Sequence, residues 1–332
     1  MLHASPHAES TPCVHGLVEW LREQGWPVRF LRPCIDPPRG DKDALRWPLD
    51  RVEFARRARA LLRAPCRGVI AIERTALLAA AALAPRGMPI LYSSTEIFLP
   101  PVFTARRHQL LNAAERIALR RAAIVLSPSA PRARLHGRLF GVEPSRRAVL
   151  PNSPRGDASW GPRTGGLCER LGIHPSRKVI LYAGALSGPN RIEDLLASAR
   201  TWPREWVLVL HGREAPGPDV ERAAGADSAR VVLSRAFVQG ADVAVALYRE
   251  DGPTFQTVGT AAGKVAAALH AGVPVATTKI RSLEYILSHC GGGVAVDAPA
   301  GLRAGIEELL ARGDDARREA AACFQRAFHF DR

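Results

Sequence analysis

A lysine, Lys264, opens an alanine-rich segment that reads GKVAAALHAGVPV over residues 263–275. The alanines favour a helix, Gly272 favours its end, and the apolar run around Pro274 is typical of a buried strand. A lysine in the first turn of a helix lies beside unpaired backbone N–H groups and the positive end of the helix dipole. The segment therefore predicts a site for an anion such as a phosphate, although Lys264 could equally be a solvated surface lysine.

A second stretch with candidate ligand-binding residues, GALSGPNRIEDLL, covers residues 184–196 and follows an expected strand. Gly184 and Gly188 would let the backbone approach a ligand closely, and Arg191 stands where the next helix begins. A guanidinium group and a helix N-terminus together stabilise a phosphate. The glycine spacing does not match G-x-G-x-x-G, which disfavours a nicotinamide cofactor. The alternative is a glycine-rich turn capped by an arginine.

The third stretch, SSTEIF at residues 93–98, follows an expected strand at residues 89–92. In open parallel sheets, ligands bind at the carboxyl ends of the strands. The stretch is therefore a candidate binding site, and Glu96 is its only ionisable group. Glu96 could also be a helix-capping or surface carboxylate.

The elements that must position these residues alternate between helix and strand. In the first half, apolar runs predict a helix that ends at Gly25, a strand over residues 28–31, and a first strand that is short or missing. Residues 152–166 show no periodicity and are expected to be a linker. Further strands are expected over residues 68–72, 89–92, 123–127, 148–150, 179–183, 206–211, 231–233, 243–247, 275–277 and 294–296.

This alternation predicts an α/β protein with two tandem Rossmann-like, doubly wound domains that face a cleft. The first domain is expected over residues 1–152 and the second over residues 153–315. A C-terminal helix over residues 316–332 could cross back to the first domain.

An amphipathic helix is expected over residues 103–121, with Leu110, Leu111, Ala114, Ile117 and Ala118 on one side and arginines around the rest. We expect this apolar stripe to pack on the sheet. The alternative is that the helix lies on an anionic membrane surface.

The formal net charge of +14 is carried almost wholly by arginine. It is consistent with compositional bias, or with attraction to anionic lipids, phosphorylated substrates or nucleic acid. We favour a bias in amino-acid composition, together with some attraction of the protein to membranes. No nucleic-acid-binding module is recognisable and aromatic residues are few, so no nucleic-acid partner is expected.

The chain has no apolar run of about 18 to 20 residues, the length that a membrane span requires. Its N-terminal residues also lack the charged-then-apolar order of a signal peptide. We therefore expect a cytoplasmic protein that could associate peripherally with the inner face of the membrane.

Several motifs, in order, resemble the donor-binding domain of GT-B glycosyltransferases, particularly the retaining, family-four-like group (glycosyl transferases group 1). They are VILYAGALSGPNRIEDLLASA, LVLHG, ADVAVALY and K-x7-G-x-P. In the first half, YSSTEIF is similar to the stretch that this family writes as Y-x-x-H-E. The resemblance covers residues 14–325.

The resemblance implies that a nucleoside-diphosphate sugar binds the second domain. Arg191 and Lys264 fall at the family's diphosphate-binding positions, where they would stabilise the departing diphosphate during catalysis. Gly184 and Gly188 would give backbone access to the donor. Glu284 is a further donor-side candidate that could equally be a surface carboxylate.

The resemblance also implies an acceptor site at Ser94, Thr95 and Glu96, with an acceptor-side or catalytic polar role for Glu96. Two positions depart from the family, because Thr95 replaces a histidine and Ala267 replaces the carboxylate that binds ribose hydroxyls. Alanine favours a helix but cannot make those hydrogen bonds.

The implied reaction moves a sugar to a glycan, lipid-linked or small-molecule acceptor, with retention and without a metal or other cofactor. Surface-polysaccharide assembly in bacteria is the expected setting. Two alternatives stay open: a catalytically silent binding or scaffold protein, and a sugar-nucleotide 2-epimerase.

Overall fold

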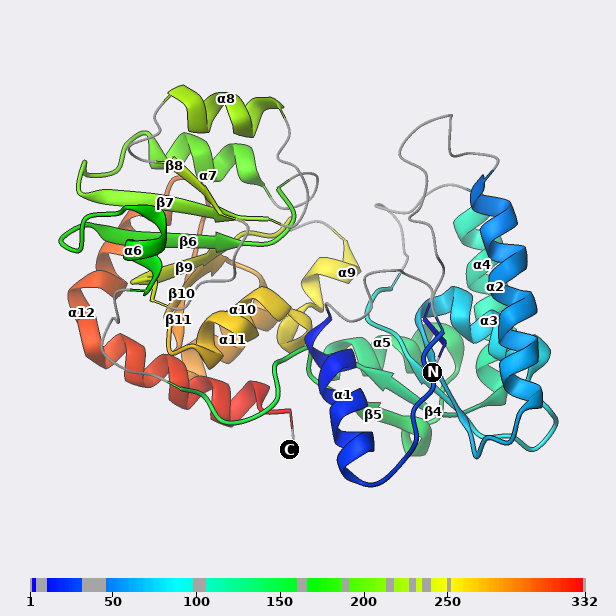
Figure 1. Ribbon diagram of the computed structural model, residues 1–332. Helices are drawn as coiled ribbons and strands as arrows, with labels where there is room; N and C mark the ends of the chain where they lie inside the picture. The colour runs from blue at the N-terminus through cyan, green and yellow to red at the C-terminus, as the bar shows by residue number, and fades with distance from the viewer. Residues whose placement is uncertain are drawn as a thin grey trace. The chain divides into compact units, whose positions relative to one another are not determined.

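The structure is a computed structural model that describes residues 2–3, 11–31, 46–97, 106–159, 166–186, 191–212, 218–226, 231–234, 240–249 and 252–330. Its contacts divide the chain into two compact units, Met1–Asn152 and Ser153–Arg332. Each unit has a parallel β-sheet with helices packed on it (Figure 1).

The sheet of the first unit has five strands that follow one another in chain order. Every neighbouring pair is parallel, and Ile72 pairs with Ser93 across the second and third strands. The first strand is only two residues long, as the sequence suggests. The strands are β1 (Leu2–His3), β2 (Val69–Ile72), β3 (Ile90–Ser93), β4 (Ala122–Ser127) and β5 (Arg147–Val149).

Three helices of the first unit form a layer in which α3 lies between α2 and α4 (Figure 1). Because α3 has a helix on each side and β2 beneath it, it is apolar almost all round, and Ala76, Leu77 and Ala80 have no solvent exposure. The helices are α1 (Pro12–Glu23), α2 (Arg46–Arg63), α3 (Glu73–Leu83), α4 (Arg106–Ala118) and α5 (Ala130–Phe140), with 3₁₀ turns at Leu119–Arg121 and Pro144–Arg146.

The strand expected over residues 28–31 does not form. Residues 26–30 have no regular structure, and only Leu31 makes an isolated bridge. The reason lies in the sheet: β1 is the edge strand and is two residues long, so it offers almost no ladder for a further strand.

The apolar stripe predicted on α4 is also wrong, because three of its members are exposed: Leu110 (72%), Leu111 (36%) and Ile117 (65%). Of the predicted stripe, Ala118 is buried, and the other buried side chain among the described residues of the helix is that of Glu115. Glu115 accepts a hydrogen bond of 2.7 Å from the hydroxyl of Tyr92 on β3. This buried polar pair sets the rotation of α4, since an unpaired buried carboxyl is costly.

The sheet of the second unit has six parallel strands in the order β11-β10-β9-β6-β7-β8. The chain runs outward from β6 in one direction and from β9 in the other, so the order reverses between these two strands. They are β6 (Lys178–Ala183), β7 (Trp206–His211), β8 (Val231–Ser234), β9 (Val243–Ala246), β10 (Val275–Thr278) and β11 (Gly293–Val296). Such a reversal is the usual place for a ligand in a doubly wound fold.

The helices of the second unit connect these strands, and its C-terminal part packs against α10 and α11. This C-terminal part includes the described residues of the helix that the sequence predicts over residues 316–332. The helices are α6 (Gly166–Leu171), α7 (Ile192–Ala199), α8 (Pro218–Ala226), α9 (Pro253–Gln256), α10 (Gly263–His270), α11 (Arg281–Cys290) and α12 (Leu302–Cys323), with a 3₁₀ turn at Gly259–Ala261 and a π-helical turn at Phe324–Phe328.

These observations confirm the predicted fold class, two α/β domains built on parallel sheets. In the part of the chain that the structure describes, no helix is long and apolar enough to span a bilayer.

Candidate functional site

Lys264 lies at the point where the strand order of the second unit reverses. It is in the first turn of α10, and its Nζ lies 4.9 Å from the ring centroid of Tyr182 and 4.5 Å from that of Tyr248. Tyr182 belongs to β6, and Tyr248 follows β9. Nζ also donates to the Tyr182 hydroxyl at 3.3 Å and to the carbonyl of Leu247 at 3.5 Å.

This enclosure changes the acidity of the amine. Removal of the ammonium group from water lowers the pKa of Lys264 to about 7. The two aromatic faces and the phenol oxygen compensate only in part for the lost hydration. The amine is thus not a solvated surface group, and an adjacent anion would favour its charged form.

Gly184 follows β6 and lies against the same lysine. A Cβ built at Gly184 would be 3.1 Å from the hydroxyl oxygen of Tyr182 and 3.6 Å from Cε of Lys264. The structure therefore brings Gly184 and Lys264 together, and their contact with an anion stays a prediction. Gly188, the other predicted glycine, lies outside the described residues.

Arg191 caps the N-terminus of α7 in a left-handed conformation, with φ of 53°. Its Nε donates to Asp194 at 2.5 Å, and its Nη2 donates to the carbonyl of Ala298 at 2.8 Å. Neither contact involves Lys264. The structure thus gives Arg191 a role in joining α7 to the segment after β11, whereas its contact with a diphosphate stays a prediction.

Glu284 lies in the first turn of α11 and lines a groove of about 440 Å³. The other lining residues come from α11, β11, α12 and the residue before α12, and include Ser288 and Glu308. Neither Lys264 nor Gly184 is among them. The groove that Glu284 lines is therefore distinct from the surroundings of Lys264, and a contact of Glu284 with the donor stays a prediction.

In the first unit, the predicted acceptor residues form a loop that is held by hydrogen bonds. The backbone N–H of Ser94 donates to the carbonyl of Leu126 at 3.0 Å, which extends the pairing of β3 with β4. The Ser94 hydroxyl donates to the carbonyl of Glu96 at 3.0 Å. The Glu96 side chain is 53% exposed, and Nη2 of the buried Arg132 lies 3.8 Å from its Oε2.

Two residues in contact with this loop were missed from the sequence, Glu73 and Arg132. Oε1 of Glu73 accepts a hydrogen bond of 3.1 Å from the backbone N–H of Thr95 and a second one from the Thr95 hydroxyl. Arg132 of α5 donates to the carbonyl of Thr95. The signal for Glu73 was present, because it is an ionisable residue directly after the buried strand GVIAI.

A polar pair on β4 and α5 lies close to Arg132. The Ser127 hydroxyl and His136 Nδ1 are 2.9 Å apart, and both residues are buried. Burial and the nearby charge of Arg132 lower the pKa of His136 to about 4, so this histidine is neutral at pH 7. No group of three or more His, Cys, Asp or Glu side chains that could hold a metal occurs among the described residues.

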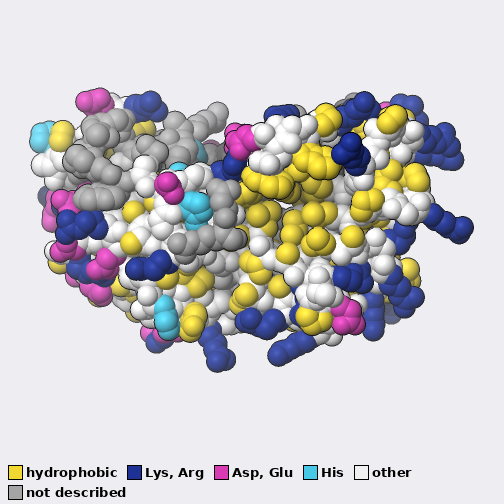
Figure 2. Space-filling model, turned by 90° about the horizontal axis from the view of Figure 1, so that it is seen from below, with side chains coloured by type: hydrophobic (Ala, Val, Ile, Leu, Met, Phe, Trp, Pro, Cys, Tyr) yellow, Lys and Arg dark blue, Asp and Glu magenta, His cyan; other side chains and the backbone are white. Residues whose placement is uncertain are grey.

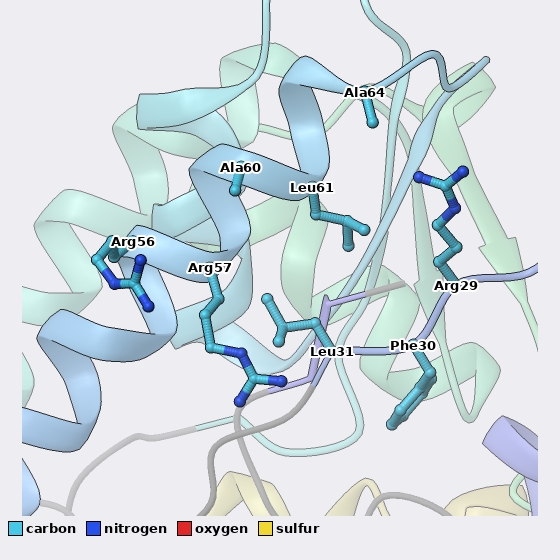
Figure 3. Close-up of a pocket in the computed structure, with 8 residues that line it drawn as sticks. All are labelled: Arg29, Phe30, Leu31, Arg56, Arg57, Ala60, Leu61 and Ala64. Atoms are coloured by element: carbon cyan, nitrogen blue, oxygen red, sulfur yellow. The ribbon is translucent and has the colours of Figure 1, made fainter.

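A pocket of about 460 Å³ in the first unit contains none of the predicted site residues (Figure 3). It lies between residues 29–31 and α2, and Figure 3 shows Leu31 and Leu61 between Arg29 and Arg57. Arg56 also lines it, with its guanidinium bonded to Glu53 at 2.7 Å and 2.8 Å.

Comparison with known proteins agrees with this architecture. Residues 10–153 match the glycosyl transferase 4-like domain. The first unit belongs to the glycosyl transferase 4-like family. No curated protein sequence matches the chain.

Solved structures extend the likeness to the whole chain. Sucrose-phosphate synthase from Thermosynechococcus elongatus is 15% identical, with 99% of this chain and 94% of that chain covered and a TM-score of 0.74. WaaG, a glycosyltransferase involved in lipopolysaccharide biosynthesis, is 13% identical, with coverage of 98% and 93% and a TM-score of 0.67. HepE from Anabaena in complex with UDP is 14% identical, with coverage of 99% and 95% and a TM-score of 0.65. The glycosyl transferase 4-like unit is therefore part of a chain with the GT-B fold.

Proposed function

We propose that this chain is a glycosyltransferase that moves a sugar from a nucleoside-diphosphate sugar to a hydroxyl of a glycan, lipid-linked or small-molecule acceptor, with retention and without a metal. The observation that carries the proposal is the enclosed amine of Lys264 beside Gly184, at the reversal of strand order. The relative HepE has been solved with UDP and with UDP-glucose, which supports a nucleotide-sugar donor.

In this proposal, the diphosphate lies next to Lys264 and the N-terminus of α10. Its charge draws a proton onto the amine, and the ammonium group then stabilises the negative charge that develops on the leaving diphosphate. The N–H groups of the first turn of α10 and the positive end of the helix dipole add to this stabilisation. Arg191 could supply a second cation if the diphosphate replaced Asp194 as its partner.

The acceptor binds at Ser94, Thr95 and Glu96 in this proposal. The half-exposed carboxylate of Glu96 can accept a hydrogen bond from an acceptor hydroxyl. The attacking hydroxyl in the retaining mechanism of the resembled family approaches the face that the diphosphate leaves, so a dedicated base is not required.

The test is a thermal-shift measurement with UDP and UDP-glucose, without added metal. A ligand that binds only the folded protein raises the melting temperature, by an amount that grows with its concentration. We expect the shift in the wild type and in Lys279→Ala, whose side chain is exposed on the same unit, and its loss in Lys264→Ala.

Release of UDP from UDP-glucose, with and without candidate acceptors, then separates the alternatives. Binding with no turnover would favour the silent binding protein, and conversion of the sugar without transfer would favour the epimerase. If no nucleoside diphosphate shifts the melting temperature at millimolar concentration, the donor site is not functional and the proposal fails.

We also propose that the first unit associates with anionic membrane surfaces. This unit contains 24 Lys and Arg and 12 Asp and Glu, a net charge of +12, whereas the second has 22 and 20, a net charge of +2. Figure 2 shows many Lys and Arg side chains over the first unit. On α4, Leu110 and Ile117 are exposed beside Arg116, a combination that favours a lipid interface.

Sedimentation with vesicles tests this partner. We expect binding to phosphatidylglycerol vesicles that weakens as salt increases, little binding to phosphatidylcholine vesicles, and weaker binding of Leu110→Ser and Ile117→Ser. No binding to anionic vesicles at low salt would exclude the membrane proposal.

A further inference from the structure

Glu73 occupies an unusual backbone position at the carboxyl edge of the first sheet. It follows β2 directly and begins α3, with φ of 67°, in the left-handed region that residues other than glycine rarely adopt. Because Ile72 pairs with Ser93, Glu73 lies beside the loop that follows β3. Non-glycine residues in this conformation cluster at functional sites, where surrounding contacts hold them.

The contacts of Glu73 hold one peptide of that loop. Oε1 of Glu73 accepts hydrogen bonds from the backbone N–H of Thr95, at 3.1 Å, and from the Thr95 hydroxyl, while Arg132 donates to the Thr95 carbonyl. The Thr95 residue is therefore fixed through its N–H, its hydroxyl and its C=O. The next residue along the chain is Glu96, whose carboxylate is half-exposed.

The other oxygen of Glu73, Oε2, is out of contact with solvent and has no hydrogen-bond partner among the described residues. An ionised carboxylate in such a place is poorly stabilised. Burial in the first place, and then the charges of Glu96 and Glu115, raise the pKa of Glu73 to about 7, although the bonds from Thr95 act in the opposite direction.

Titratable and charged groups among the described side chains face Glu73 from several elements, and the backbone of His3 on β1 pairs with Ile72 beside it. These groups are Cys13 of α1, Arg74 of α3, Tyr92 of β3, Glu96 of the loop and Glu115 of α4, with Arg132 of α5 on the far side of Thr95. Burial raises the pKa values of Cys13 and Tyr92 away from neutrality, to about 12 for Cys13.

We propose that Glu73 is a positioning residue for the acceptor: its carboxyl group fixes Thr95, and through Thr95 it sets the direction of the Glu96 carboxylate at the edge where the acceptor binds. The acceptor part of this inference rests on the proposed function. The fixing of the loop does not, because it follows from the contacts of Glu73 alone.

The protonation state of Glu73 changes the strength of this fixing. A carboxylate accepts hydrogen bonds more strongly than a neutral carboxylic acid. The Thr95 bonds are therefore strongest above pH 7 and weaken as the pH falls and Glu73 becomes neutral. The loop that presents Glu96 is consequently better ordered on the alkaline side of neutrality.

Hydrogen exchange measured by mass spectrometry on the full chain tests the proposal without any substrate. In Glu73→Ala, the peptide that covers residues 94–97 should exchange about 10-fold faster at Thr95, because its N–H loses its acceptor. Glu73→Gln keeps an amide oxygen at the same place and should restore most of the protection. Glu143→Ala, which removes an exposed glutamate of the same unit, should match the wild type.

The pH profile separates positioning from simple packing. After correction for intrinsic exchange, protection of Thr95 should rise between pH 6 and pH 8 in the wild type and stay flat in Glu73→Gln. Thr95→Val, which preserves shape but removes the hydroxyl, should reduce the rise and serves as the second variant if Glu73→Ala does not fold. Equal protection in the wild type and both Glu73 variants, or a flat wild-type profile, would overturn the proposal.

A parallel UDP thermal shift keeps the two proposals apart. The shift should persist in Glu73→Gln, because Lys264 is in the second unit. If no nucleoside diphosphate, UDP included, binds the wild type while the exchange results hold, the proposed function is wrong and Glu73 still fixes the loop. If UDP binds and the exchange results fail, only the Glu73 proposal is refuted.

Discussion

The low pKa of Lys264 should make the protein less stable at pH 7 than at pH 9. The folded-state pKa is about 7, whereas the ordinary value is 10.5, so between these values the unfolded chain binds a proton that the folded protein does not. Unfolding is then favoured by protons, and stability rises with pH across this window. Below pH 7 the cost of burying the ammonium group is present in full.

The magnitude follows from the two pKa values. From pH 7 to pH 9 the unfolded lysine stays charged, while the folded one changes from half protonated to almost neutral. A difference of one bound proton between the unfolded and folded states changes the free energy of unfolding by about 1.4 kcal/mol per pH unit. The free energy of unfolding should therefore increase by about 2 kcal/mol from pH 7 to pH 9.

Urea unfolding at pH 7, 8 and 9 measures this change, with Lys264→Met as the variant and Lys279→Met as the matched control. Thiols and other groups also titrate in this range, but they are common to all three proteins, so the difference between wild type and variant isolates Lys264. The increase should disappear in Lys264→Met and persist in Lys279→Met. The same pH dependence in Lys264→Met and wild type would refute the enclosure of the amine.

Two packing predictions address the elements around the sites. Tyr92→Phe should lower the free energy of unfolding by about 1–3 kcal/mol, because it removes the hydrogen-bond donor of the buried Glu115, and urea unfolding against the wild type measures it. Gly293→Ala should cost about 3 kcal/mol, because an added Cβ would lie 2.0 Å from the carbonyl oxygen of Val275. Gly225→Ala in α8 is its control, since nothing lies within 4 Å of the added atom and alanine favours the helix. A Gly293→Ala protein as stable as the wild type would contradict the pairing of β10 with β11.

Much of the fold could be predicted because strands buried on both faces read as continuous apolar runs. VILYA in β6 and VAVA in β9 are of this kind, and their interior positions are buried. The segment at residues 28–31, VRFL, is apolar at three of four positions but forms no strand, and the described part of β1 at the edge of the sheet is only two residues long. Composition identifies a segment that can be a strand, whereas the sheet decides whether a partner is available.

The rotation of α4 could not be predicted, although its helical periodicity was clear. Its leucines and isoleucine are the obvious inner face, yet a contact with Tyr92, 23 residues away in the chain, turns Glu115 inward and leaves Leu110 exposed. Hydrophobic periodicity assumes that the buried face is the apolar one. A buried hydrogen bond overrides that assumption.

The sequence by itself determined the α/β class, the strand endings that carry the candidate residues, and the position of Lys264 at the start of a helix. Only the tertiary structure decided what those residues contact: Lys264 between two tyrosines, Arg191 on the carbonyl of Ala298, and Glu73 on Thr95. The physical reason is the distance along the chain over which each effect acts. Strand and helix propensities act over a few neighbouring residues, whereas the environment that sets a side chain's charge and direction is assembled from residues that lie 16 to 107 positions apart in the chain, as for Lys264 and Tyr248 and for Arg191 and Ala298.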